Sequence, residues 1–214
     1  MVLDLLVIGA AITAGPLHNS AFILLLSARN GVRQGMAFLL SWLANLIAVI
    51  VCVVLLTGGR QLVHHSAPST AAVAVKLAIG LALVVYGALR HRRPAHPRRP
   101  PRWAARIDDA SPAVAAGLAW MLQPWALVAA GAATAVDADL STVADWFALA
   151  CYCLIATLSL IVMEAYALRS PEAAGARLQA LRGWMDRHQE SLIVTLSLLA
   201  GLYLVARSIY DLVT

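Results

Sequence analysis

The chain has 214 residues, of which 61% are hydrophobic and only 13% are charged. A soluble domain of this size needs far more charged residues to cover its surface, so the composition excludes that class and indicates an integral membrane protein. The net charge of +5 would suggest a nucleic-acid partner for a soluble protein. Here the basic residues lie between apolar segments, so we expect the bilayer and no nucleic acid as the partner.

Six apolar segments are each long enough to cross a bilayer as a helix, which takes about 20 residues. They cover residues 4–27, 35–57, 69–89, 111–136, 144–167 and 191–211. The sequence therefore predicts an all-α integral membrane protein with six transmembrane helices.

Basic residues are distributed unevenly over the predicted loops. The loops after the first, third and fifth segments hold thirteen of the sixteen basic residues, whereas the opposite side holds only Arg60 and Arg207. Loops rich in Lys and Arg stay in the cytoplasm. The pattern predicts a multi-pass protein of a bacterial inner (plasma) membrane, with both termini facing away from the cytoplasm.

A basic, proline-rich linker joins the third and fourth segments. Residues 90–110 contain the run RHRRPAHPRRPPR, which should be extended because proline favours the polyproline conformation. Its arginines serve to fix the topology, and binding of anionic lipid headgroups at the inner leaflet is the alternative.

A short helix is expected between the fifth and sixth segments. Ser170-Pro171-Glu172 is typical of a helix start, and Leu178, Leu181 and Met185 fall on one face of the helix that follows. We expect residues 171–188 to form an interfacial helix lying on the inner membrane surface.

The two halves of the chain resemble each other. KLAIGLALVVYG and SLLAGLYLVARS align on Gly80 and Gly201, and the Gly-Pro pair of the first segment has its counterpart in the Gln-Pro pair of the fourth. Because each half has three segments, the second half would be inserted upside down, as in the inverted repeats of many secondary transporters. We expect two three-helix repeats, residues 1–89 and 111–214.

The two prolines should break the first and fourth helices near the middle of the membrane. A mid-helix proline removes a backbone hydrogen bond, and such a break is tolerated in lipid only where protein or water satisfies the freed groups. The half-helices beginning there would present N–H groups and a positive dipole end to an anion. The alternative is a pair of packing kinks with internally bonded polar groups. The candidate binding residues are Gly15, Pro16, His18, Asn19, Gln123 and Pro124.

Three further residues within the segments carry open alternatives. Lys76 could snorkel outward, pair with an aspartate of the outer loop, or contact the substrate. Glu164 is expected to form an interfacial ion pair with Arg169, with proton transport as the alternative. Trp42 falls near a predicted interface, where tryptophan forms aromatic belts.

The quoted motifs resemble those of a known family. The stretches GPLHNSAFILLLSARNGVRQGMAFLLSWLANLIAV, PRWAARIDDASPAVAAGLAWMLQPWALVAAGAATA and RLQALRGWMDRHQESLIVTLSLLAGLYLV together resemble the GAP family of actinobacterial membrane proteins. That family includes sulfolipid-1-addressing and glycopeptidolipid-addressing proteins and is placed in the lysine exporter superfamily. The resemblance implies a six-helix, non-enzymatic protein that helps cell-envelope glycolipids reach the surface, beside a larger lipid transporter.

The chain departs from that family at the fourth segment. Relatives usually carry Asn-Pro-Lys there, whereas this chain has Gln123-Pro124-Trp125, so the charge of the lysine is missing. Any headgroup or ion-coupling role of that lysine therefore does not carry over.

Three functions remain open at this point. The first is transport or surface addressing of an anionic envelope lipid, the second is export of amino-acid-type solutes, and the third is a scaffold for a lipid export or synthesis complex. A cation exporter needs carboxylates at mid-depth, and every acid here lies near the end of a segment, which favours the first and third. We expect no enzymatic activity, cofactor or metal site, and a homo-oligomer is left open.

Overall fold

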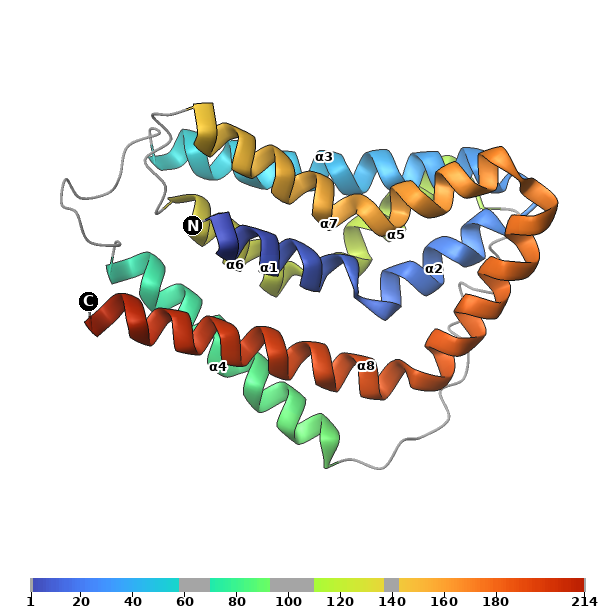
Figure 1. Ribbon diagram of the computed structural model, residues 1–214. Coiled ribbons are helices and arrows are strands. Elements are labelled where there is room, and N and C mark those ends of the chain that lie inside the picture. The colour runs from blue at the N-terminus through green and yellow to red at the C-terminus, as the bar shows by residue number, and fades with distance from the viewer. Residues whose placement is uncertain (1, 58–69, 93–109, 137–142, 214) are drawn as a thin grey trace.

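The structure is a computed structural model that describes residues 2–57, 70–92, 110–136 and 143–213 (Figure 1). The described residues are almost entirely helical. They form eight helices: α1 (Val2–Thr13), α2 (Pro16–Leu26), α3 (Gly31–Thr57), α4 (Thr70–His91), α5 (Pro112–Leu122), α6 (Trp125–Val136), α7 (Val143–Arg169) and α8 (Pro171–Val213). The basic linker expected at 90–110 lies mostly outside the described residues.

Four of the described helices, α3, α4, α7 and α8, are long and apolar enough to cross a membrane. Two pairs of shorter helices could each form one further span with a bend in it. The chain bends by 51° between α1 and α2 and by 70° between α5 and α6. The predicted breaks in the first and fourth segments are therefore confirmed, and the number of candidate spans is four to six.

Both breaks follow from the prolines. Proline restricts the residue before it to extended conformations, because its ring clashes with a helical neighbour. Gly15 accordingly has φ −60° and ψ 124°, and Gln123 has φ −63° and ψ 134°. Pro16 then becomes the first residue of α2, a position where its missing N–H costs nothing.

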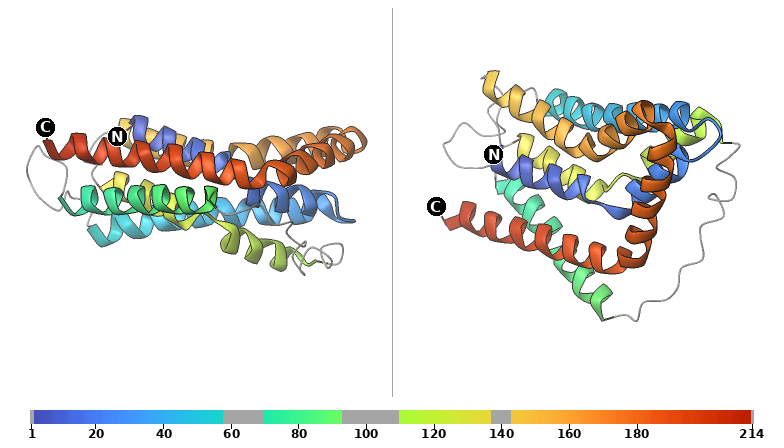
Figure 2. Two further views of the ribbon diagram at one scale, coloured as in Figure 1. Left: turned by 90° about the horizontal axis from the view of Figure 1, so that it is seen from below. Right: turned by 45° about the vertical axis from the view of Figure 1, so that its right-hand side comes forward.

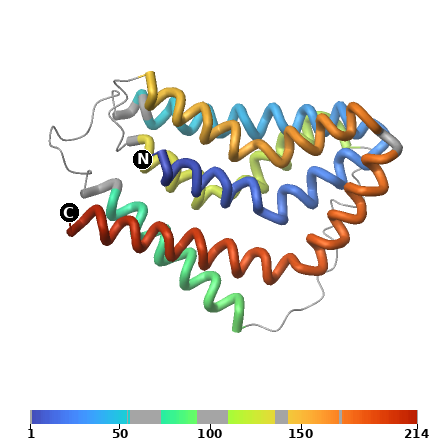
Figure 3. The backbone as a smooth tube through the Cα atoms, viewed as in Figure 1, coloured from blue at the N-terminus to red at the C-terminus, as the bar shows by residue number. Residues whose placement is uncertain are grey.

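The last helix extends beyond the end expected for the interfacial helix. Residues 171–188 are helical and form the first part of the 43-residue α8, which continues into the sixth segment. Figures 1 and 3 show that this first part is turned sharply from the rest of the helix. Leu178 and Met185 are buried in the core, so this part packs on the protein as well as reaching its surface. Helix formation continues because the sequence after Pro171 contains no further proline.

The helices pack in a reciprocal pattern around the two bent pairs. The bent helices contact the long ones, α1 with α7 and α5 with α3, and likewise α2 with α8 and α6 with α4. Figure 2 shows α4 and α8 together on one side of the molecule, and Figure 1 shows both ends of the chain at the same end of the bundle.

The α4–α8 pair is held by a glycine contact in its middle and by one charged contact on each side, Lys76 with Asp211 and Arg90 with Glu190. A Cβ atom on Gly201 would lie 2.8 Å from the carbonyl oxygen of Gly80, so the two backbones approach as closely as the absence of side chains allows. Towards the end of α4, Arg90 forms two hydrogen bonds of 2.8 Å to Glu190. Small residues at a crossing are the usual means of close helix packing in membranes.

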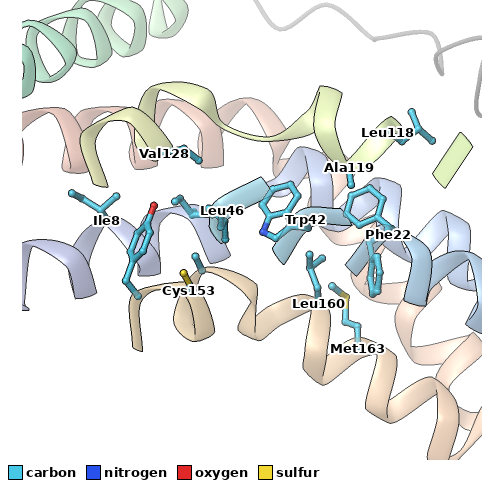
Figure 4. Packing of buried hydrophobic residues seen from close by; sticks show 14 of the residues in the cluster. Ile8, Phe22, Trp42, Leu46, Leu118, Ala119, Val128, Cys153, Leu160 and Met163 are labelled. Carbon is cyan, nitrogen blue, oxygen red and sulfur yellow. The ribbon is translucent and has the colours of Figure 1, made fainter. Parts of the chain in front are cut away.

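The core lies between the bent pairs and the helices α3 and α7 (Figure 4). Its largest buried side chains include Phe22, Phe38, Trp42 and Tyr152. Trp42 is fully buried and packs on Phe38 with ring centroids 6.0 Å apart, so it belongs to the core and not to the expected interfacial belt. Packing of this kind stabilises helices in lipid, where apolar burial alone gives no driving force.

Candidate functional site

At the first helix break, the ring of His18 packs against Gly15, the residue before Pro16. His18, on the first turn of α2, is 2% exposed, and its ring lies over Gly15, where a Cβ atom would come within 2.6 Å of Cε1. The ring also packs on Trp42 with centroids 4.6 Å apart. Gly15 is therefore needed for the close approach of the ring.

Asn19 uses its side-chain amide within the protein. Its Nδ2 atom donates to the carbonyl oxygen of Thr13 at 2.8 Å, and Ser159 Oγ donates to its Oδ1 atom at 2.9 Å. Thr13 is the last residue of α1, where the final carbonyls have no partner within the helix. Asn19 therefore repairs the break and links it to α7, which is the behaviour of a packing kink.

Gln123 behaves in the opposite way at the second break. Its side chain is 4% exposed, and neither Oε1 nor Nε2 has a hydrogen-bond partner among the residues that the structure describes. Its own carbonyl oxygen accepts from the N–H of Trp125 at 2.9 Å across Pro124. Buried amides almost always find partners, so this one is available to a ligand or to water.

Other buried polar atoms of the described residues share this property. His18 Nε2, Trp42 Nε1, Asn45 Nδ2 and the hydroxyl group of Tyr152 have no hydrogen-bond partner within the described part of the chain. The tyrosine hydroxyl lies over Gly131 of α6, where a Cβ atom would come within 2.5 Å of it. Unpaired buried polar groups cost about 1–3 kcal/mol each, so the unpaired atoms of Gln123 and of the touching pair His18 and Trp42 indicate that the breaks are built for something other than stability.

The two breaks lie next to each other in the middle of the molecule in both Figure 1 and Figure 2. The four half-helices also contact each other crosswise, α1 with α6 and α2 with α5. The residues predicted from the sequence at the two breaks are thus brought into the same region, and the polar side chains described there supply donors and acceptors but no carboxylate.

Lys76, the remaining predicted site residue, belongs to a different cluster. It is 4% exposed and lies on α4 with its Nζ atom 3.8 Å from Asp211 Oδ2 on α8, so it does not snorkel to an exposed end. Arg207 lies 3.3 Å from Asp211 and 3.4 Å from Asp4. Tyr203 donates a hydrogen bond of 2.5 Å to Asp4. These five residues, which we name the Asp4 cluster, join α1, α4 and α8 by alternating charges.

Glu164 also differs from the expectation. It is 3% exposed, and neither carboxylate oxygen has a hydrogen-bond partner among the described residues, so the predicted ion pair with Arg169 is not formed. Residues five apart on a helix are turned about 140° from each other, which explains why the pair does not form. The carboxylate lies over Gly35 of α3, at a position that a Cβ atom would obstruct.

Comparison with known families agrees with the motifs. The model of the family described as "Sap, sulfolipid-1-addressing protein" matches residues 5–210, which is nearly the whole chain. The chain belongs to the sulfolipid-1-addressing protein family. Searches among curated proteins and among solved structures find no match.

The region that matches the sulfolipid-1-addressing family includes both helix breaks and the Asp4 cluster, except for Asp4 itself and Asp211. It places the chain among helical membrane proteins associated with envelope lipids. The sequence analysis did not include Trp42 and Tyr152 among the polar groups of the candidate site. Both are aromatic residues that can form hydrogen bonds and that share a helix face with core positions, and this pattern could have identified them.

Proposed function

We propose that the protein helps an anionic cell-envelope lipid reach the cell surface, and that it binds the lipid headgroup at the two helix breaks without catalysing a reaction. A larger lipid transporter would work beside it. The family description supports the lipid class, because it names sulfolipid-1 and a sulfolipid is anionic. The observation that carries the site is the Gln123 side chain, buried in the middle of the bundle with both amide atoms unpaired among the described residues.

The chemistry of the breaks suits an anion. α2 begins at the first break, and no side chain caps its first turn. α6 begins at the second break, where the N–H groups of Trp125 and Leu127 already donate to the carbonyl oxygens of Gln123 and Pro124. Helix N-termini bind anions through their N–H groups and positive dipole end. Gln123 Nε2 and Trp42 Nε1 add donors, and His18 Nε2 adds another when it carries a proton.

We further propose that the two halves are inverted repeats related by exchange of α1 with α5, α2 with α6, α3 with α7 and α4 with α8. Under this exchange, contact of α1 with α7 becomes contact of α5 with α3, and contact of α2 with α8 becomes contact of α6 with α4. Both pairs of contacts are present. Gly80 and Gly201, the positions aligned from the sequence, also touch at the α4–α8 crossing. Such repeats place a binding site at their interface.

Export of small cationic solutes is a weaker alternative. A cation would need a carboxylate at the breaks, whereas the buried polar side chains there are those of His18, Asn19 and Gln123. Glu164 and Asp4, the buried acids among the described residues, lie near the ends of α7 and α1. We therefore favour the anionic lipid.

The test is complementation of a deletion strain with variants that keep the fold. Surface-extractable lipids would be compared between cells carrying wild-type protein, Gln123→Leu and Gln179→Leu, at matched protein abundance. Gln179 is an exposed glutamine of α8 and supplies the matched control. We expect Gln123→Leu to lower lipid delivery about ten- to a hundredfold, since a hydrogen bond to a charged group contributes about 1.5–3 kcal/mol.

A scaffold that never touches the lipid predicts a different result. In that case Gln123→Leu would deliver lipid as well as wild type, because the variant changes no outer surface. Normal delivery by this variant at normal abundance would therefore reject the proposed site and favour the scaffold.

A further inference from the structure

A groove lies at the other side of α3, away from the helix breaks. It has a volume of about 700 Å³ and runs from the turn before α3 along that helix to the start of α5. Arg29 and Arg33 line one end, Met36 and Leu40 line the other, and Pro112 closes the side. The groove is therefore cationic at one end and apolar along the rest of its length.

The helical spacing produces this arrangement. Arg33, Met36 and Leu40 are separated by three and four residues, so they share one face of α3, while Phe38 and Trp42 occupy the buried face. The seven steps from Arg33 to Leu40 correspond to about 10 Å along the helix axis. Gly31–Val53 is a candidate membrane span, so this face of α3 is accessible to lipid from the side.

The two arginines are not neutralised by the part of the chain that the structure describes. No ion pair with Arg29 or Arg33 is formed by any residue in the described ranges, whereas Arg90 pairs with Glu190 and Arg182 with Asp186. Both side chains are exposed. Two unpaired guanidinium groups at the end of an apolar groove complement a molecule with an anionic head and a hydrocarbon tail.

We propose that this groove binds one anionic membrane lipid, with the headgroup phosphate or sulfate on Arg29 and Arg33 and an acyl chain along Met36 and Leu40. The site is separate from the helix breaks and does not depend on the proposed function. Arginine suits the headgroup because its planar guanidinium donates two parallel hydrogen bonds to such oxygens.

The experiment measures lipid binding to the full chain in detergent by native mass spectrometry. Phosphatidylglycerol and phosphatidylcholine with the same acyl chains would be titrated against wild type, Arg29→Gln/Arg33→Gln, and a control with Arg177→Gln/Arg187→Gln. The control removes the same charge from two exposed arginines of α8. A basic residue near the membrane surface contributes about 1 kcal/mol to binding an anionic lipid, so we expect the first double variant to lose about ten- to thirtyfold of the preference for phosphatidylglycerol.

Two further arms keep the result decisive. Arg33→Gln alone should give an intermediate loss if the double variant folds poorly, and millimolar inorganic phosphate should not displace the lipid, because it lacks the acyl chain. Retained preference in the Arg29→Gln/Arg33→Gln variant would overturn the proposal. An equal loss in the α8 control would also overturn it by showing diffuse charge attraction, as would displacement by inorganic phosphate.

Discussion

Replacing Gln123 by leucine should make the protein more stable while it lowers lipid delivery. The side chain is 4% exposed and neither amide atom has a described partner, so the substitution removes no hydrogen bond. Leucine has a similar size, which limits any change in packing. Removing a buried polar group that lacks a partner recovers its desolvation cost, which protein mutations place at about 1–3 kcal/mol. We therefore expect the free energy of unfolding to rise by about that amount.

Asn19→Leu provides the contrast, because it makes the same chemical change at the other break. This variant loses the bonds of Asn19 to the Thr13 carbonyl and to Ser159, and both partners are left unpaired. Hydrogen bonds between membrane helices contribute about 0.6 kcal/mol on average, and orphaned buried groups cost about 1–3 kcal/mol. We expect the free energy of unfolding to fall by about 1–3 kcal/mol, which is opposite in sign to the change expected for Gln123→Leu.

The measurement is unfolding of the purified variants in one detergent, followed by loss of helical circular dichroism against denaturant. Lipid delivery would be scored in cells with the same variants. If Gln123→Leu unfolds more easily than wild type, Gln123 is bonded in the folded protein and the reasoning behind the site fails.

Three other predictions concern the packing of the helices and the topology of the chain. Gly201→Ala should destabilise the protein by about 1–3 kcal/mol, because the new Cβ atom would meet the backbone of Gly80, whereas Gly117→Ala, with open space around it, should be neutral or slightly stabilising in the same unfolding assay. Lys76→Met should cost less than about 3 kcal/mol, since Asp211 keeps Arg207, and a stability equal to wild type would show that the pair contributes nothing. A reporter active only in the cytoplasm, fused after Thr214, should give no signal, and a strong signal would contradict the topology predicted from the loop charges.

Much of the fold could be predicted because its causes are local. Proline acts on its own N–H and on the residue before it, so the bends at Pro16 and Pro124 could be located from the sequence. Apolar length likewise located the long helices. The end of the predicted interfacial helix was missed for a related reason, since the sequence after Pro171 contains no proline to stop α8.

The partners of polar side chains could not be predicted, because they come from distant parts of the chain. Asn19 meets Ser159, 140 positions away, and Lys76 meets Asp211 on the last helix. Both contacts depend on how the helices are turned about their axes. Successive residues of a helix point about 100° apart, so a small change in that orientation brings different side chains together.

Asn19 and Gln123 show why this difference matters for function. In the sequence they look alike: each is an amide close to a proline in the middle of an apolar segment, Asn19 three residues after Pro16 and Gln123 directly before Pro124. In the structure Asn19 closes the gap in its helix and is bonded on both atoms, whereas Gln123 is buried with both atoms unpaired among the described residues. The first arrangement lowers the free energy of the folded chain and the second raises it. Strain and unpaired groups persist where function requires them, so of the two amides Gln123 is the better candidate for contact with the lipid.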